Sequence, residues 1–177
     1  MITEVFTATT YGVDAFVVRV ETHIDNSLFS FAIVGLPDNA VKESKERVAA
    51  AIKNSYFHFP VKRYTVNLAP ADVKKEGSGF DLPIAIGIIC ETSQVSPSKV
   101  KDYLFIGELS LDGKLRPITG VLPIALEAKR NNFKGIILPV ENAKEAAIVE
   151  GIDIFPFETL MEVIDFLNDE VSPKPFT

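Results

Sequence analysis

The segment from residue 69 to residue 81 carries the residue types best suited to chemistry in this 177-residue chain. It places lysines and carboxylates around glycines and a serine, in the order Asp72, Lys74, Lys75, Glu76, Gly77, Ser78, Gly79, Asp81. A Gly-containing loop that feeds an apolar helix exposes backbone N–H groups near the positive end of the helix dipole, where an anion could bind. A phosphate-binding P-loop needs Gly-x-x-x-x-Gly-Lys-Ser/Thr, which this segment lacks. The competing interpretation is a turn made by the glycines, with solvated lysines.

Metal chemistry finds little support in the same residues. Asp72, Glu76 and Asp81 lack the dense oxygen-ligand spacing of a calcium loop, and Asp81 is better placed to cap the following helix. His23 and His58 have no cysteine or second histidine nearby, so a zinc site is not expected. We therefore predict no metal site.

The elements that position this segment are a short strand before it and an apolar helix after it. Residues 64–68 are predicted to form the strand, and residues 82–90 have no polar face, so their helix should be buried and Cys90 should be an inert core thiol. Before them, residues 5–9, 15–20 and 28–34 read as a three-stranded antiparallel meander. A helix with Asp38 as its N-cap follows, with Val41, Val48, Ile52 and Tyr56 on one stripe.

The second half alternates strands and helices, a pattern that indicates parallel pairing. Strands are expected at 104–106, 135–138 and 152–155, helices at 121–130, 141–150 and 160–168, and a hairpin turn at 111–114. The predicted order is β-β-β-α-β-α followed by β-α-β-α-β-α. We expect one α/β domain over residues 1–170, with a meander-plus-helices half (1–95) and a parallel βα half (103–168), and a linker at 171–177.

The composition indicates in which cellular compartment this domain is expected. A single cysteine excludes a disulfide framework and fits a reducing cytoplasm, and the N-terminus shows no export signal. The longest apolar run, residues 82–90, is half the length of a membrane span. We therefore expect a cytoplasmic protein without a membrane partner.

Charge is distributed unevenly along the chain. Residues 42–75 contain eight basic and three acidic residues, a net charge of +5, whereas the whole chain carries −6. A basic face of this kind is a candidate for nucleic-acid binding. The candidate residues are Lys42, Lys45, Lys53, Lys62, Arg63, Lys74 and Lys75. The alternative is a solvated helix with Glu43 and Arg47 paired at i,i+4.

Aromatic residues stand inside the same basic region, at Tyr56, Phe57, His58 and Phe59. Aromatics among basic residues can stack on single-stranded nucleic acid. The stronger interpretation is that Phe57 and Phe59 close the core between helix and strand.

Several ordered motifs run through most of the chain. They are VGLPD (34–38), VKESKERV (41–48), NLAPADVKKEG (67–77), FDLPIA (80–85), GELSLDG (107–113) and RPITGVLP (116–123). Together they resemble the amino-terminal domain of the ComM/YifB family of Mg chelatase-like, competence-related AAA+ ATPases. The resemblance implies a following ATPase module that binds ATP and Mg, a hexameric ring, and DNA as a partner in recombination, branch migration or competence.

The domain is also similar to the proteolytic domain of Lon and to the Lon-like domain of RadA, which implies a ribosomal-protein-domain-2-like fold. Lon-type proteases activate a serine with a lysine. Matching the motifs puts the nucleophile position at Gly79 and the lysine position at Leu122, and neither residue can do the chemistry. Ser78 is one residue out of register.

Three functions follow for testing. The first is a non-catalytic domain that aids ring assembly and DNA engagement by its own ATPase module. The second is a cryptic Ser-Lys peptidase acting through Ser78. The third is a pure protein-interaction module.

Overall fold

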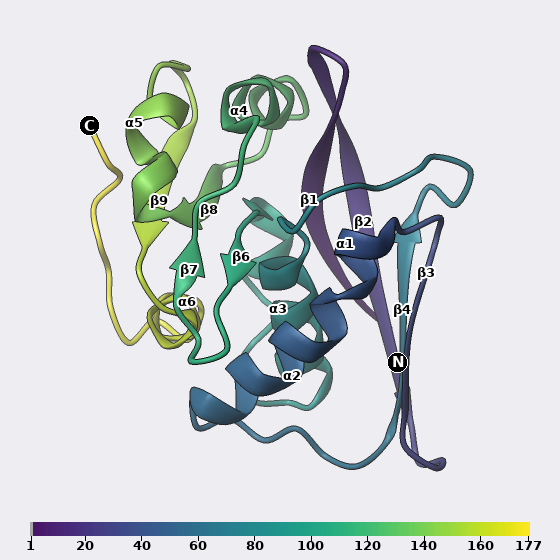
Figure 1. Ribbon diagram of the computed structural model, residues 1–177. Helices are drawn as coiled ribbons and strands as arrows, with labels where there is room; N and C mark the ends of the chain where they lie inside the picture. Colours follow the sequence, from purple (N-terminus) through teal and green to yellow (C-terminus); the bar gives the residue numbers. More distant parts are fainter. Residues whose placement is uncertain (1) are drawn as a thin grey trace.

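A computed structural model describes residues 2–177 and shows a mixed α/β fold built on one seven-stranded sheet (Figure 1). The strands lie in the order β3-β4-β2-β1-β5-β8-β9. Their bounds are β1 Thr3–Tyr11, β2 Asp14–Asp25, β3 Ser30–Val34, β4 Arg63–Ala69, β5 Tyr103–Phe105, β8 Gly135–Pro139 and β9 Asp153–Phe157. Pairing is antiparallel for β1–β2 and β2–β4, and parallel for β3–β4, β1–β5, β5–β8 and β8–β9, so the sheet is mostly parallel.

Six helices and two short 3-10 turns accompany the sheet. Their bounds are α1 Asn39–Lys42, α2 Ser44–Asn54, α3 Asp81–Glu91, α4 Val121–Arg130, α5 Ala143–Ala146, α6 Leu160–Leu167, and 3-10 turns at Val100–Asp102 and Val140–Asn142. A separate two-stranded ribbon joins β6 Glu108–Leu109 to β7 Leu115–Arg116 through the predicted 111–114 turn. Within the described chain, no helix combines the length and apolar composition needed to cross a bilayer.

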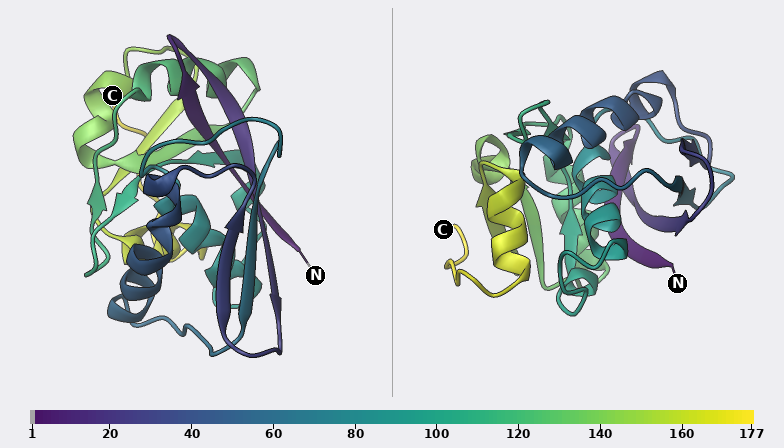
Figure 2. Two further views of the ribbon diagram at one scale, coloured as in Figure 1. Left: turned by 45° about the vertical axis from the view of Figure 1, so that its right-hand side comes forward. Right: turned by 90° about the horizontal axis from the view of Figure 1, so that it is seen from below.

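The two faces of the sheet support two apolar clusters. Alternate residues divide between them, so that Phe105 and Ile137 join one cluster while Leu104 and Ile136 join the other, as strand geometry requires. The first cluster takes in α2, α3 and α6, and the second takes in α4 and α5 (Figure 2). Because α3 lies between the sheet and α2, its residues 81–90 are all buried, which confirms the expectation from its apolar sequence.

The predicted three-stranded meander is wrong. Strands β1 and β2 form the expected hairpin, but β4 lies between β2 and β3 and pairs with both. The four residues between β2 and β3 can span up to about 13 Å, and stepping over one strand needs about 10 Å. The connection through α1 and α2 then makes β3 and β4 a parallel β-α-β unit.

Other elements differ from the sequence-based expectation in length. Tyr56 does not extend the buried stripe of α2, because it adopts a left-handed conformation (φ 67°) beyond the helix and is 87% exposed. The expected helix at 141–150 is reduced to a 3-10 turn and the single turn of α5. The order of elements therefore departs from the predicted one at α5, at the separate helix α1 and at the added β6–β7 ribbon.

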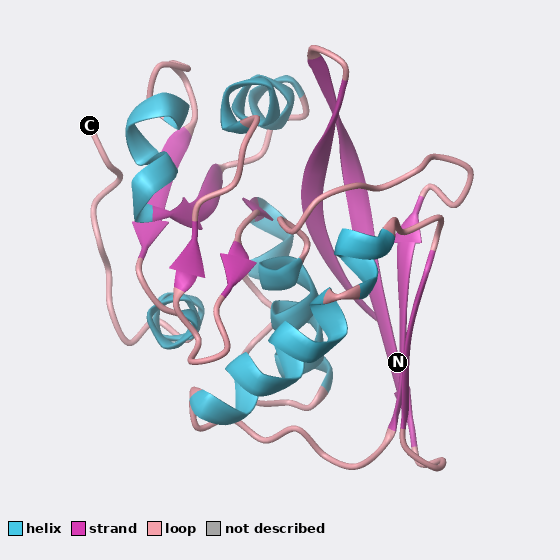
Figure 3. Cartoon of the chain, viewed as in Figure 1, coloured by secondary structure: helices cyan, strands magenta, loops and turns pink. Residues whose placement is uncertain are grey.

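The C-terminal tail is irregular in structure but lies against the domain (Figure 3). The backbone N–H of Phe176 donates to the carbonyl of Ile154 in β9 at 2.8 Å, and the Phe176 side chain packs on the second apolar cluster. The tail predicted as a linker thus covers the outer strand of the sheet at the β9 side.

Candidate functional site

A pocket of about 440 Å³ lies where the ends of β1 and β5 meet the loop before α3 and the segment before α4. The loop contributes its glycines and Ser78, and two carboxylates, Asp38 and Glu76, stand at the wall. The remaining lining residues are Ala8, Thr9, Thr10, Ala40, Phe80, Ile106, Pro117, Ile118, Thr119 and Ile124. Among the described residues that line it, none is a lysine, arginine or histidine.

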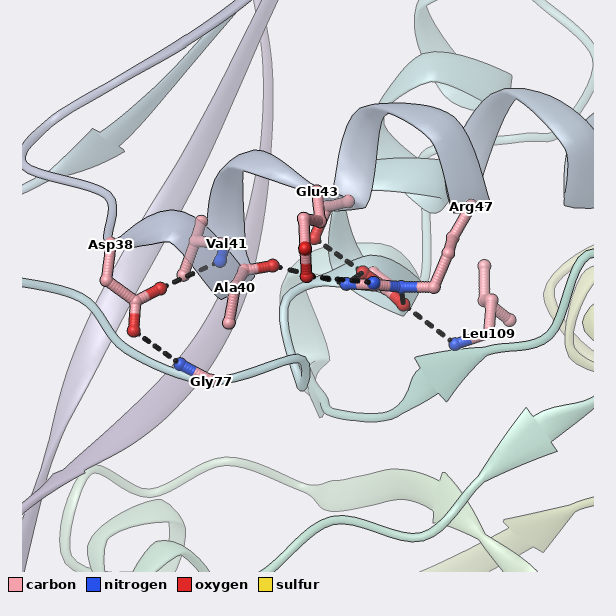
Figure 4. Close-up of polar contacts among 9 residues, drawn as sticks. Asp38, Ala40, Val41, Glu43, Arg47, Gly77 and Leu109 are labelled. Carbon is pink, nitrogen blue, oxygen red and sulfur yellow. Dashed lines mark hydrogen bonds and ion pairs between the residues drawn. The ribbon is translucent and has the colours of Figure 1, made fainter.

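Asp38 holds the loop against the start of α1. Its Oδ1 accepts from the N–H of Val41 at 2.8 Å, which confirms the predicted N-cap, and its Oδ2 accepts from the N–H of Gly77 at 3.4 Å (Figure 4). The Asp38 N–H donates to the carbonyl of Lys75 at 2.9 Å, and the Lys75 N–H donates to the carbonyl of Leu36 at 3.0 Å. One carboxylate and a two-bond bridge therefore fix both sides of the loop entrance.

Lys75 is buried, so the expectation that it faces solvent or nucleic acid is wrong. Its side chain has no exposed surface, and Nζ donates to the carbonyl of Gly35 at 2.7 Å and to that of Pro70. Burial lowers the pKa of Lys75, and the nearby Asp72 opposes that shift. The Lys75 ammonium group ties the end of β3 to the start of the loop and does not line the pocket.

Asp81 is buried at the first residue of α3, and the expectation that it caps this helix is wrong. Oδ2 accepts from Arg47 Nε at 2.7 Å and from the N–H of Leu109 at 3.0 Å, and Oδ1 accepts from Ser44 Oγ and from Arg47 Nη2 at 3.1 Å. Burial raises the pKa of Asp81, while these hydrogen bonds favour its charged form. This carboxylate joins α3 to α2 through Arg47 and to β6 through the N–H of Leu109.

Sequence reasoning missed this polar cluster, although one signal pointed to it. An aspartate that begins an all-apolar helix must find partners, because buried charges are almost always paired. The helical spacing pairs Arg47 only with Glu43, and that pair does form, with Nη1 and Oε1 3.9 Å apart. The shorter contacts of Arg47 are to Asp81, from a turn of α2 that faces the core.

The two Lon-like positions do not meet across the pocket. Gly79 lines it, and a Cβ added there would stand 3.5 Å from a methyl of Ile118, an ordinary contact, so space for a side chain exists. Leu122 lies in the first turn of α4, where its N–H donates to Glu145 Oε2 at 3.1 Å and its side chain packs on the second apolar cluster. Ser78 lines the pocket without a lysine beside it among the lining residues.

The accessible basic candidates are divided between distant places. Lys42 and Lys45 belong to α1 and α2, Lys74 belongs to the loop after β4, and Lys62 and Arg63 stand at the start of β4. Since β4 has seven residues, its two ends are about 20 Å apart. Lys53 near the end of α2 lies over the Phe59 ring, 5.5 Å from its centroid.

The aromatic segment packs inward, in agreement with the stronger of its two interpretations. Phe57 and Phe59 are partly buried against the first apolar cluster, and Phe59 stacks on Tyr64 with ring centroids 4.6 Å apart. Burial raises the pKa of Tyr64 to about 12. The other two members of this segment, Tyr56 and His58, are exposed.

The residues considered for metal binding are spread out in the fold. Asp72 is exposed, Glu76 pairs with Lys74 at 3.6 Å, and Asp81 is occupied by Arg47. Over residues 2–177, no three His, Cys, Asp or Glu side chains gather closely enough to hold an ion.

Comparison with known proteins relates the chain to three kinds of relative. Residues 20–142 match the family described as subunit ChlI of Mg-chelatase. The chain is 43% identical over 166 residues to competence protein ComM of Haemophilus influenzae, covering 94% of this chain and 32% of that protein. It is 39% identical over 174 residues to the uncharacterized protein YifB of Escherichia coli, covering 97% and 34%. It is 31% identical over 111 residues to Lon protease 2 of Bacillus subtilis, covering 60% and 20%.

The chain therefore spans about a third of the length of the curated ComM and YifB relatives that it matches.

Proposed function

The chain belongs to the family described as subunit ChlI of Mg-chelatase, and from this premise we propose that it is the non-hydrolytic amino-terminal domain of a ComM/YifB-type AAA+ ATPase. In this proposal the domain has the fold of the Lon proteolytic domain, a ribosomal-protein-domain-2-like fold. The match to Lon protease 2 over 60% of the chain and the parallel β5–β8–β9 half support that assignment.

One observation carries the non-hydrolytic role. In the loop that resembles a protease active site, the two buried charged residues, Lys75 and Asp81, hold neighbouring segments in place. Lys75 binds the carbonyls of Gly35 and Pro70, and Asp81 binds Arg47. Gly79, which the Lon resemblance matches to the nucleophile, lines the pocket. A serine without a general base is a weak nucleophile at neutral pH.

The work of the domain, in this proposal, is to aid ring assembly and DNA engagement by the ATPase module in recombination, branch migration or competence. ATP and Mg belong to that module, the assembly is a hexameric ring, and the setting is the cytoplasm. The exposed basic side chains Lys42, Arg63 and Lys74, together with the half-buried Lys62, supply the DNA contacts. Their distance from one another fits an extended polyanion better than a compact ligand.

The DNA contacts can be tested in the intact ATPase. A variant with Lys42, Lys62, Arg63 and Lys74 changed to glutamine is compared with a control of equal charge change at Lys101, Lys129, Lys134 and Lys144. Removing one phosphate contact should reduce the slope of log affinity against log salt by about 0.9. We expect a flatter slope and weaker binding only in the first variant. Equal salt-dependence slopes in both variants would show that these four residues do not contact DNA, and would favour the pure protein-interaction module.

The peptidase alternative has its own measurement. We expect a serine-reactive fluorophosphonate to leave Ser78 unlabelled, so that the chain and its Ser78→Ala variant give the same result. A Ser78-dependent adduct would instead establish a cryptic hydrolase, because only an activated serine reacts at a useful rate.

A further inference from the structure

The outer strand β3 presents an open backbone edge. We call residues 27–36 the β3 edge. Among the described residues β3 pairs only with β4, on one side. The Ser30 N–H donates toward β4, to the carbonyl of Lys62 at 3.4 Å, and successive residues of a strand direct their backbone groups to opposite sides. The N–H and C=O groups of Phe31 and Ile33 therefore point away from β4.

The β3 edge has no residue that would keep another strand away. Its ten residues, SLFSFAIVGL, include no Asp, Glu, Lys, Arg or Pro. Four apolar side chains in it are exposed: Leu28 by 92%, Phe29 by 54%, Val34 by 45% and Leu36 by 54%. Natural edge strands are protected by charge, proline, bulges or a covering segment, and an uncharged apolar edge otherwise recruits another strand.

Both ends of the β3 edge are held in place. Leu36 adopts a left-handed conformation (φ 59°), rare for a bulky residue, and its carbonyl accepts from the Lys75 N–H at 3.0 Å. At the other end Phe29 packs edge-on against Phe59 and Tyr64, with centroids 6.4 Å apart in each case. The exposed apolar side chains are therefore presented on a fixed backbone.

The opposite edge of the sheet, at β9, is covered by the C-terminal tail. The tail follows β9, where Phe176 donates its N–H to the Ile154 carbonyl and packs its ring on the second apolar cluster. One edge thus has a cover within the chain, and the β3 edge has none among the described residues.

We propose that the β3 edge pairs antiparallel with the β3 edge of a second copy of this chain about a two-fold axis. Such an interface uses the same surface twice, so it must be self-complementary. An uncharged apolar run meets this requirement, because no like charges face each other, and each copy offers the free backbone groups that the other needs. A polyanion or a charged peptide would find no complementary charge there. The pairing is independent of the proposed function, since it uses neither the pocket nor the basic residues.

The pairing is weak for separate chains and stronger in an assembly. Two short strands with four flanking apolar side chains bury less than the roughly 1,600 Å² of a standard stable interface. Copies held in one assembly by other contacts have effective concentrations in about the mM range, which favours contacts too weak to persist between free chains.

Introducing charges of opposite sign into two variants tests whether the partner is a second copy of the chain. One variant carries Ala32→Lys with Val34→Lys, and a second carries Ala32→Glu with Val34→Glu. Both side chains are on the open face of the sheet, so substitution leaves the core intact. In sedimentation equilibrium up to about 1 mM, each variant alone should self-associate at least about tenfold more weakly than the unsubstituted chain, and an equimolar mixture of the two should recover association.

The control is Ile148→Lys, which adds charge at a side chain 68% exposed, in the segment between α5 and β9, and β9 is the edge strand opposite β3. It should associate like the unsubstituted chain. Any one of three results would overturn the proposal. The unsubstituted chain could remain monomeric at about 1 mM, both charged variants could associate as strongly as it does, or the mixture could fail to recover association. Recovery in the mixture also shows that both variants are folded.

Discussion

Lys75 and Asp81 are the two charged side chains without exposed surface in the described part of the chain, and both serve the backbone around one loop. Lys75 joins the end of β3 to the start of the loop, and Asp81 joins the end of the loop to α2 and β6. Burying a charge is costly unless it is paired and hydrogen-bonded, and these two are. The shape of the loop is therefore maintained by two buried charged side chains whose hydrogen bonds all go to other groups of the protein.

Removing the charge of Asp81 tests this view. Asp81→Asn keeps the size of the side chain but leaves Arg47 without its buried counter-charge, so the free energy of unfolding should fall by about 3 kcal/mol. Glu43→Gln is the control, because Glu43 is largely exposed and its contact with Arg47 is 3.9 Å long. It should cost at most about 0.5 kcal/mol. Urea denaturation measures both, and equal losses would contradict a structural role for Asp81.

Cys90 gives the chain an alkaline instability. Burial raises the pKa of its thiol from 9.0 to about 12. The unfolded thiol ionises above pH 9 and the folded one does so only near 12. The stability is therefore complete below pH 9 and is lost as pH rises from 9 to 12. Between pH 8 and pH 10 the free energy of unfolding should fall by about 1 kcal/mol from this group, and Cys90→Ala should remove that part of the fall. Tyr64, with its pKa raised to about 12, contributes mainly above pH 10.

At the scale of single elements, the sequence predicts those features that depend on residues close together in the chain. The cap at Asp38, the helix at 121–130 and the turn at 111–114 all depend on residues within a few positions of one another, and all three form. The pairing of β3 with β4, and the partners of Asp81, depend on residues at least 28 positions away. Sequence pattern alone cannot rank such contacts, because they are decided by packing across the fold.

Gly35 shows how closely two of these elements approach. It directly follows β3, with φ 105°, and a Cβ there would stand 2.3 Å from the backbone carbonyl oxygen of Leu68 in β4. Gly35→Ala should therefore lower the free energy of unfolding by about 3 kcal/mol, through strain and overpacking. Gly12→Ala is the matched control, since its φ is 62° but nothing lies within 4 Å of its added Cβ. It should cost about 1 kcal/mol. Equal losses in thermal unfolding would show that crowding at Gly35 is relieved by movement of β4.

At the scale of the whole molecule, the sheet has helices on both faces and differs at its two edges. The two apolar clusters close most of both faces, but one face of β3 stays open at Ala32 and Val34. New contacts with other chains therefore fall on the edges, on this open part of β3 and on the rim of the pocket. With the β9 edge covered by the tail, a two-fold pairing of β3 edges ends at two copies, because no second open edge continues it. The tail therefore has two roles: it packs on the domain, and it limits association to two copies.

Deleting residues 172–177 should change the kind of association as well as its strength. The β9 edge loses its cover at Ile154, whose backbone groups become free to pair, while Pro156 has no N–H to donate and keeps the pairing short. The β3 edge of one copy can then pair weakly with the β9 edge of another in a head-to-tail arrangement that does not close. Light scattering coupled to size-exclusion chromatography should then show masses that rise beyond two copies with concentration. The Ala32→Lys, Val34→Lys substitutions should suppress this rise in the truncated chain, because every link in such an assembly uses one β3 edge. Growth that is insensitive to those substitutions would mean that β9 edges pair with each other.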